Sequence, residues 1–246
     1  MPRIYKKPPL IEALCEIKFA DTEGDFTSWG SFYQKVKKTY PQKSELPRGI
    51  EFQFTPNESS IKPAEFVKRF ISNDNAQLIQ ATRESLTLNR LSPYLGYVDF
   101  EKSFVKVLKI YTEIFSPKRI TQLSMRYVNQ IIIPSSEFSL VDYFGLVPGL
   151  PEGVTDFISN VVVQLQIAPQ IDNHFLQVTL RSAPSAVEDK STFFLDIFDA
   201  FAFNSDFNET DIIKTMDDAH TNIEHVFEKI IREKLREVFQ EAKENE

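Results

Sequence analysis

The sequence predicts an α+β fold. A largely antiparallel, curved sheet of about seven or eight strands packs against helices, and a long C-terminal helix follows it. Alternating apolar and polar residues recur in short segments, and the short links between successive segments demand antiparallel pairing. Helical periodicity occurs in separate segments between and after them. Glycine is scarce, at 7 of 246 residues, and no glycine cluster follows a strand and opens a helix, so Rossmann and P-loop nucleotide sites are not expected.

The composition indicates a folded chain with an aromatic core. Apolar residues make up 42% and charged residues 26%, and Phe occurs 22 times. With 246 residues, the chain is long for one ordinary domain and short for two. We expect a single α+β domain over 1–246, or two intimately packed halves, about 1–95 and 96–246.

The net charge of −7 disfavours nucleic acid as a partner, because a field of that sign repels phosphates. The single cysteine, Cys15, excludes an internal disulfide and a multi-cysteine zinc site. Glu12 and Glu16 interrupt the apolar N-terminal run, so a signal peptide is not expected. No apolar stretch is long enough for a membrane helix, and we therefore expect a cytoplasmic protein without a membrane partner.

The first part of the chain alternates between strands and helices. Residues 10–20 predict a strand that buries Cys15, because Ala13, Cys15 and Ile17 alternate with Glu12, Glu16 and Lys18. Further expected elements are a helix over 25–41, a strand over 49–55, a short helix over 62–72 and a hairpin over 76–91 that turns near residues 83–85. The helix over 62–72 is expected because Pro63 lies near its first turn.

The second part opens with a strong helix over 97–115, whose apolar stripe runs from Phe100 to Phe115 at spacings of three and four. A long strand over 119–134 follows, and then a loop over 139–154 with at most one helical turn at its start. The remaining expected elements are strands over about 157–169, 173–182 and 191–203, and one long helix over about 208–243.

The terminal helix carries two of the three histidines. His220 and His225 are five residues apart, about 140° around a helix axis, so they cannot clamp one metal ion. His220 lies within the expected apolar stripe, which contains Ile213, Met216, His220, Ile223, Phe227 and Ile230. It is either a hydrogen-bonded core residue or a polar group facing an internal cavity, and Asp217 could hold its imidazole.

The strand over 119–134 has polar residues on both faces. Tyr127 and Asn129 share one face, and Arg126 lies on the other. In one interpretation Arg126 is on a wet outer face and Asn129 near the rim. In the other, Arg126, or Tyr127 with Asn129, lines a pocket between sheet and helix, where an arginine would select an anionic ligand.

The remaining candidates for chemistry are few. Asp196 and Asp199 have opposite parity in one strand and so face opposite sides, although one of them could be buried and paired. His174 lies beside a turn and has no obvious carboxylate partner in sequence. We expect no catalytic constellation, no metal site and no cofactor.

Three segments carry a family resemblance: the opening YKKPPLIEALCEIKF, the central LSMRYVNQIIIP, and the closing helix DDAHTNIEHVFEKIIREKLREVF. Together they resemble a sporadically distributed bacterial family of proteins of about this length, with no assigned function. The resemblance spans nearly the whole chain and implies a single cytoplasmic module. Its patchy distribution is that of accessory genes, including defence and toxin–antitoxin genes, and it implies no activity.

These observations favour a non-enzymatic interaction module that binds a protein partner or itself. A small-molecule binder is the alternative, with a cavity between the sheet and the C-terminal helix lined by Arg126, Tyr127, Asn129, Asp217 and His220. An enzyme that uses His220 and Asp217 as an acid–base pair is a third possibility, and it lacks an identifiable nucleophile.

Overall fold

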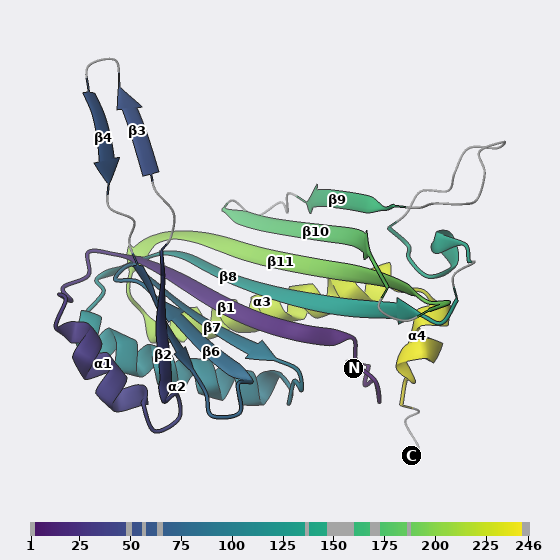
Figure 1. Cartoon of the computed structure of the whole chain (residues 1–246), viewed down its shortest axis with the longest axis horizontal. Helices are drawn as coiled ribbons and strands as arrows, with labels where there is room; N and C mark the ends of the chain where they lie inside the picture. The colour runs from purple at the N-terminus through teal and green to yellow at the C-terminus, as the bar shows by residue number, and fades with distance from the viewer. Residues whose placement is uncertain are drawn as a thin grey trace. The chain divides into compact units, whose positions relative to one another are not determined.

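A computed structural model gives the structure of the chain (Figure 1). It describes residues 3–47, 51–55, 58–62, 66–135, 138–146, 160–167, 173–185 and 188–242, with the backbone alone described for 51–55 and 58–62. The chain divides into two compact units. Unit 1 contains residues 1–13, 124–201 and 214–246, and unit 2 contains residues 14–123 and 202–213. The expected halves, 1–95 and 96–246, stay a prediction.

Four elements contribute residues to both units: β1 (Leu10–Ala20), β8 (Arg119–Ile133), β11 (Ser191–Asp206) and α3 (Glu209–Ile230). Unit 2 also contains α1 (Ser28–Val36), β2 (Gln42–Pro47), β3 (Glu51–Thr55), β4 (Glu58–Lys62), β5 (Phe66–Ile71), β6 (Gln77–Ala81), β7 (Ser85–Leu91) and α2 (Tyr97–Phe115). Unit 1 adds a 3₁₀ turn (Leu140–Asp142), β9 (Val162–Ile167), β10 (His174–Ala183) and α4 (Glu233–Phe239).

The expected α+β class with an antiparallel sheet is confirmed. Nine strands form an open sheet in the order β2-β5-β6-β7-β1-β8-β11-β10-β9, and β3 and β4 form a separate two-stranded sheet. The expected number of seven or eight strands was too low. Besides β5, which was expected as part of a helix, the missed strands in the first half are β2 and β4. Strand β2 has every residue exposed and therefore no alternating apolar signal.

Unit 2 owes its core to aromatic side chains. The expected stripe of α2 is confirmed, since Phe100, Phe104, Val107, Leu108, Tyr111 and Phe115 are all buried. The Tyr111 hydroxyl reaches the carbonyl oxygens of Thr82 and Arg83, at 2.9 and 2.7 Å, and so fixes α2 against the turn of the β6–β7 hairpin. The expected hairpin over 76–91 is present, with its turn between β6 and β7.

The expected helix over 62–72 is wrong, because residues 66–71 form strand β5. Phe66, Val67, Phe70 and Ile71 are spaced as on a helix, and Pro63 suggested its first turn. The segment instead pairs with β2 on one side and β6 on the other. Tertiary pairing overrides local propensity in such short segments.

The expected single helix over 208–243 is also wrong, because this segment forms two helices. Helix α3 ends at Ile230, and α4 begins at Glu233. Ile231 forms a β-bridge with Phe144, and the Arg232 amide donates to the Tyr143 carbonyl at 2.9 Å. The Gly145 amide donates a hydrogen bond to the Ile230 carbonyl at 2.7 Å. A segment almost ninety positions away in sequence thus satisfies the backbone at the break.

The other expectations for the second half are confirmed where the structure describes them. The loop after β8 contains the 3₁₀ turn at its start, and β9, β10 and β11 follow. The parts of these expectations that fall on residues 147–159 and 168–172 lie outside the described residues.

Candidate functional site

Two of the five expected site residues meet in unit 1, where α3 packs on the sheet. The Tyr127 hydroxyl lies 2.8 Å from Nδ1 of His220. Nε2 of His220 lies 3.5 Å from a carboxylate oxygen of Glu224, one helical turn further on. In a neutral imidazole one ring nitrogen donates and the other accepts, so this arrangement suits Nε2–H facing Glu224 and Nδ1 accepting from Tyr127.

Burial determines the charge of His220. Desolvation lowers the pKa of His220 to about 4, and the nearby charge of Asp217 acts in the opposite direction. The imidazole is therefore neutral at pH 7. His220 lies at the flank of the buried stripe, whose centre is formed by Met216, Ala219 and Ile223. The phase of the stripe is thus one position earlier than expected.

A second polar cluster on the same face was missed by the sequence analysis. Nε2 of His174, on β10, bonds one carboxylate oxygen of Asp199, on β11. The side-chain amide of Asn222, on α3, donates to the other oxygen at 3.0 Å. Asp199 is fully buried, so the expectation that one acid of the 196/199 pair would be buried and paired is confirmed.

The environment of Asp199 opposes its ionisation. Desolvation raises the pKa of Asp199, and the hydrogen bonds from Asn222 and His174 act against that increase. The His174 ring stacks on Phe201, with centroids 4.1 Å apart, and its Nδ1 has no hydrogen-bond partner among the described residues. The cluster is thus enclosed by apolar and aromatic groups.

Imidazole–carboxylate pairs are also a feature of acid–base catalysis. Catalysis would require a nucleophile or a substrate within reach of the imidazole, and both His174 and Asp199 are buried. Within the described ranges, no hydroxyl or thiol bonds to His174. The arrangement as it stands holds β10, β11 and α3 together.

The other expected site residues are dispersed. Arg126 lies on the opposite face of the sheet and pairs with Asp196 of β11 through both carboxylate oxygens. The amide of Asn129 donates to the Leu195 carbonyl at 3.2 Å inside the unit. Asp217 is exposed on α3. These residues therefore do not converge on one cavity.

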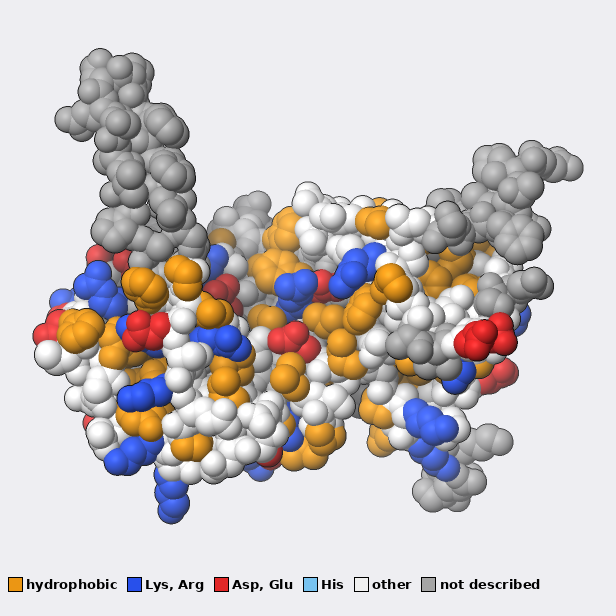
Figure 2. All heavy atoms as spheres, viewed as in Figure 1, with side chains coloured by type: hydrophobic (Ala, Val, Ile, Leu, Met, Phe, Trp, Pro, Cys, Tyr) orange, Lys and Arg blue, Asp and Glu red, His pale blue; other side chains and the backbone are white. Residues whose placement is uncertain are grey.

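The face of the molecule seen in Figure 2 is a mixed surface. Hydrophobic side chains there are interleaved with both signs of charge. Arg181 lies over the ring of Phe194 at 4.6 Å, and Phe175 contacts Phe198 edge-on with centroids 6.1 Å apart. Arg126 and Arg181 thus already have partners within the sheet, and these partners compete with any anion for them.

Strand β9 is an exposed strand at one end of the sheet order in unit 1. It is the last strand of the sheet order and, among the described strands, pairs with β10 alone. Its sequence, VVQLQI, contains no charged residue. Val162 is 67% exposed, and Leu165 and Ile167 are 43% and 41% exposed. An uncharged apolar edge strand is a template for pairing with another chain.

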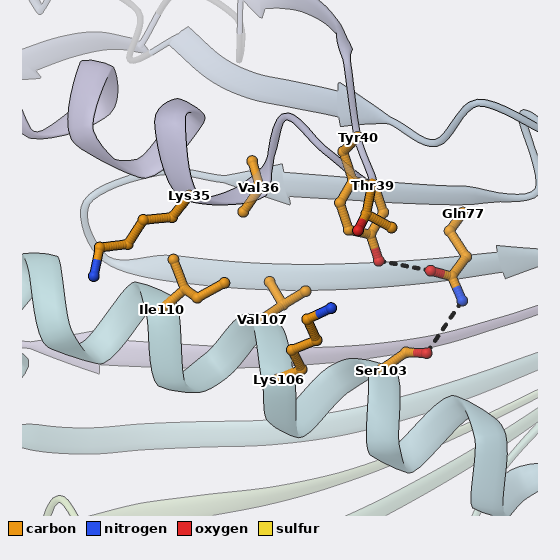
Figure 3. A pocket seen from close by; sticks show the side chains of 9 residues that line it. All are labelled: Lys35, Val36, Thr39, Tyr40, Gln77, Ser103, Lys106, Val107 and Ile110. Atoms are coloured by element: carbon orange, nitrogen blue, oxygen red, sulfur yellow. Dashed lines mark hydrogen bonds between the residues drawn. The ribbon is translucent and has the colours of Figure 1, made fainter.

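Unit 2 contains a small pocket between α1, α2 and β6 (Figure 3). Its volume is about 70 Å³. The Tyr40 hydroxyl donates to Gln77 at 2.6 Å, and the Gln77 amide donates to Ser103 at 3.3 Å. The pocket is far smaller than the roughly 300–1,000 Å³ of typical ligand sites, and hydrogen bonds join three of its polar lining residues, Tyr40, Gln77 and Ser103.

Comparisons with known proteins add no function. Neither a scan against protein-family models nor a search of curated proteins finds a match. Among the described residues, no group of three or more His, Cys, Asp or Glu side chains could hold a metal ion. No helix in the described ranges is both long enough and apolar enough to cross a membrane.

Proposed function

We propose that this chain is a non-enzymatic protein-interaction module, and that unit 1 binds an extended segment of a partner chain along the edge of β9 that no other described strand pairs with. The observation that carries this proposal is the exposed, uncharged sequence of β9 at the end of the sheet order. In such strand addition, main-chain hydrogen bonds supply affinity and alternate side chains supply specificity.

The side chains of β9 suit such a partner. Val163, Leu165 and Ile167 share one face, and Gln164 and Gln166 share the other. A partner strand would extend both the apolar face and the polar face by one position. Natural edge strands are usually protected by charge, proline or a bulge, and β9 contains no charge and no proline.

The geometry gives less support to the alternative, a small-molecule site between sheet and helix. The groups expected to line it bond to each other across that space, as Tyr127 does with His220. Asn222 of α3 and Asp199 of β11, which were not expected in the lining, are also joined by a hydrogen bond between helix and sheet. A ligand would have to break these buried hydrogen bonds, which is costly.

Two further parts of the proposal rest on the sequence. The family resemblance supports a role in a bacterial accessory system, such as a defence or toxin–antitoxin system. The presence of a single cysteine, Cys15, supports a cytoplasmic location, because the chain can form no internal disulfide.

A photo-crosslinking amino acid at position 162, introduced in cells, tests the edge. We expect one defined adduct whose sequenced peptide is an extended segment of the partner chain. The adduct should disappear when L165K is added, because an inward-facing charge blocks strand addition.

The matched control places the same amino acid at position 46. Leu46 is on edge strand β2 and is 44% exposed, almost as Leu165 is. Adducts of equal yield at both positions, or an adduct at 162 that survives L165K, would contradict the proposal.

A further inference from the structure

We infer that the partner strand is β9 of a second copy of this chain, paired antiparallel about a two-fold axis at Leu165. This inference rests on the proposed function, since it names the occupant of the same edge. A two-fold contact uses the same surface patch on both copies, so that patch must be complementary to itself.

The charge of β9 permits self-pairing. The whole chain has a net charge of −7, which opposes association of two copies at long range. Strand β9 has no charged side chain that would repel its counterpart at contact. The opposite edge strand, β2, carries Lys43 and Glu45 and ends at Pro47. Its Glu45 is engaged with Lys68 of the neighbouring strand at 2.5 Å.

The alternation of side chains sets the register. A two-fold axis perpendicular to the sheet keeps each face on its own side, so only residues of the same parity lie opposite each other. With the axis at Leu165, this residue faces its own copy and Val163 faces Ile167. All apolar pairs then lie on the face that carries the buried residues of β10, Leu176, Val178 and Leu180.

The other face gains a polar row in the same register. Gln164 faces Gln166 of the second copy on both sides of the axis. Within one chain, the Gln164 amide already donates to Gln177 of β10 at 3.0 Å. The glutamines therefore extend an existing cross-strand hydrogen bond across the contact. An axis at Gln164 would instead set Val162 against Gln166.

Single cysteine variants test the register. With the axis at Leu165, the two Cβ atoms of an L165C dimer lie about 4.5–5.5 Å apart, close to the span of a disulfide. In V163C the two cysteines are offset by four positions, about 13 Å along the strand. Mild oxidation should therefore link L165C into a covalent dimer and leave V163C monomeric. The native Cys15 does not compete, because it is fully buried.

The outcomes separate clearly. Selective linking of L165C supports the inference. Equal linking of both variants overturns it, because that pattern reflects random collision. Selective linking through Q164C in place of L165C overturns the register, since the axis would then lie at Gln164.

Sedimentation of the purified full chain over a wide concentration range tests assembly without cysteines. We expect a reversible dimer that L165K weakens at least tenfold and L46K leaves unchanged. A wild-type chain that stays monomeric, or a dimer insensitive to L165K, overturns self-pairing. If the chain is monomeric and the photo-crosslink at 162 contains a different protein, the proposed function stands without this inference. If that crosslink also fails, the proposed function fails independently.

Discussion

The two edge strands of the sheet, β2 in unit 2 and β9 in unit 1, differ in how far their side chains hinder pairing with another strand. Strand β2 is fully exposed and carries Lys43, Glu45 and Pro47, whereas β9 carries no charge. Behind β2 the sheet packs through aromatic side chains such as Phe70. Behind β9 it buries His174 and Asp199. Charged side chains thus lie on the exposed edge strand at the β2 end, whereas β9 has none and the polar groups near it are buried, so its edge is suited to pairing with another strand.

The largest expected effect is at the β2 end, where apolar packing carries the stability. Phe70 is buried, and its ring lies 5.2 Å from Phe32 and 6.1 Å from Tyr33. We expect F70A to cost about 3–5 kcal/mol, measured by urea unfolding, with F70L costing much less. Hydrogen exchange should show unit 2 losing protection before unit 1. A loss below about 1 kcal/mol would contradict the role given to this aromatic cluster.

The second largest effect is expected at the buried polar cluster of His174, Asp199 and Asn222. D199A leaves His174 and Asn222 without their shared acceptor inside the unit, and we expect a cost of about 3 kcal/mol. The matched control is D196A, on the same strand but on the opposite face, where the pair with Arg126 is half-exposed. We expect D196A to cost less than about 1 kcal/mol. Equal costs would remove the distinction between the two faces.

Acid should weaken unit 1 through His220. Because its folded pKa is about 4 and its ordinary value is 6.5, the unfolded chain binds the proton more tightly between these values. Stability is therefore complete above pH 6.5 and falls as the pH decreases, by about 2 kcal/mol at pH 5. Unfolding free energies at pH 7 and pH 5 measure the fall.

The same measurements on H220Q isolate this histidine from its neighbours. The raised pKa values of Asp199 and Glu224 act in the opposite direction, because they favour the folded state as acid is added. The difference between wild type and H220Q removes their contribution. An identical pH dependence in both proteins would show that His220 is not buried as a neutral ring.

The smallest effect tests whether charge protects β2. The double variant K43T E45T removes the Glu45–Lys68 pair, and we expect a stability change below about 1 kcal/mol. It should, however, give β2 a weak tendency to associate, because an uncharged edge no longer repels another strand. Sedimentation of the K43T E45T L165K chain would reveal association through β2, because L165K blocks pairing at β9. A strictly monomeric K43T E45T L165K chain would mean that Pro47 or the strand geometry protects this edge instead.

The sequence predicted well where the signal was local. Helix α2 was predicted over 97–115 and lies there, because its six buried stripe residues are spaced as one helix face. Strand β5 lies in a segment that was predicted as a helix because Pro63 stood near its expected first turn, and pairing with β2 and β6 makes it a strand. The break after Ile230 depends on residues 143–145, which no local pattern reveals.

The site illustrates the same limit. The opposite parity of Asp196 and Asp199 predicted that one of them could be buried, and Asp199 is the buried one. Its partner His174 could not be assigned, because the β10–β11 register places Leu176 opposite Asp199 and His174 one diagonal step away. That step became visible only with the three-dimensional pairing. The uncharged sequence of β9, in contrast, can be read directly from the chain, and its importance comes from its place at the edge of the sheet.

Unit 1 is built from segments that are far apart in the sequence, and this determines when it can fold during synthesis. Residues 4–7 bond to residues 239–242, through Lys6 and Gln240, Lys7 and Phe239, and Ile4 and Ala242. A ribosome releases these partners at opposite ends of the described chain. Unit 2, which lacks only residues 202–213 after residue 123 has emerged, can begin to fold much earlier. Unit 1 therefore cannot form these bonds until residues 239–242 have left the ribosome, well after most of unit 2 has emerged.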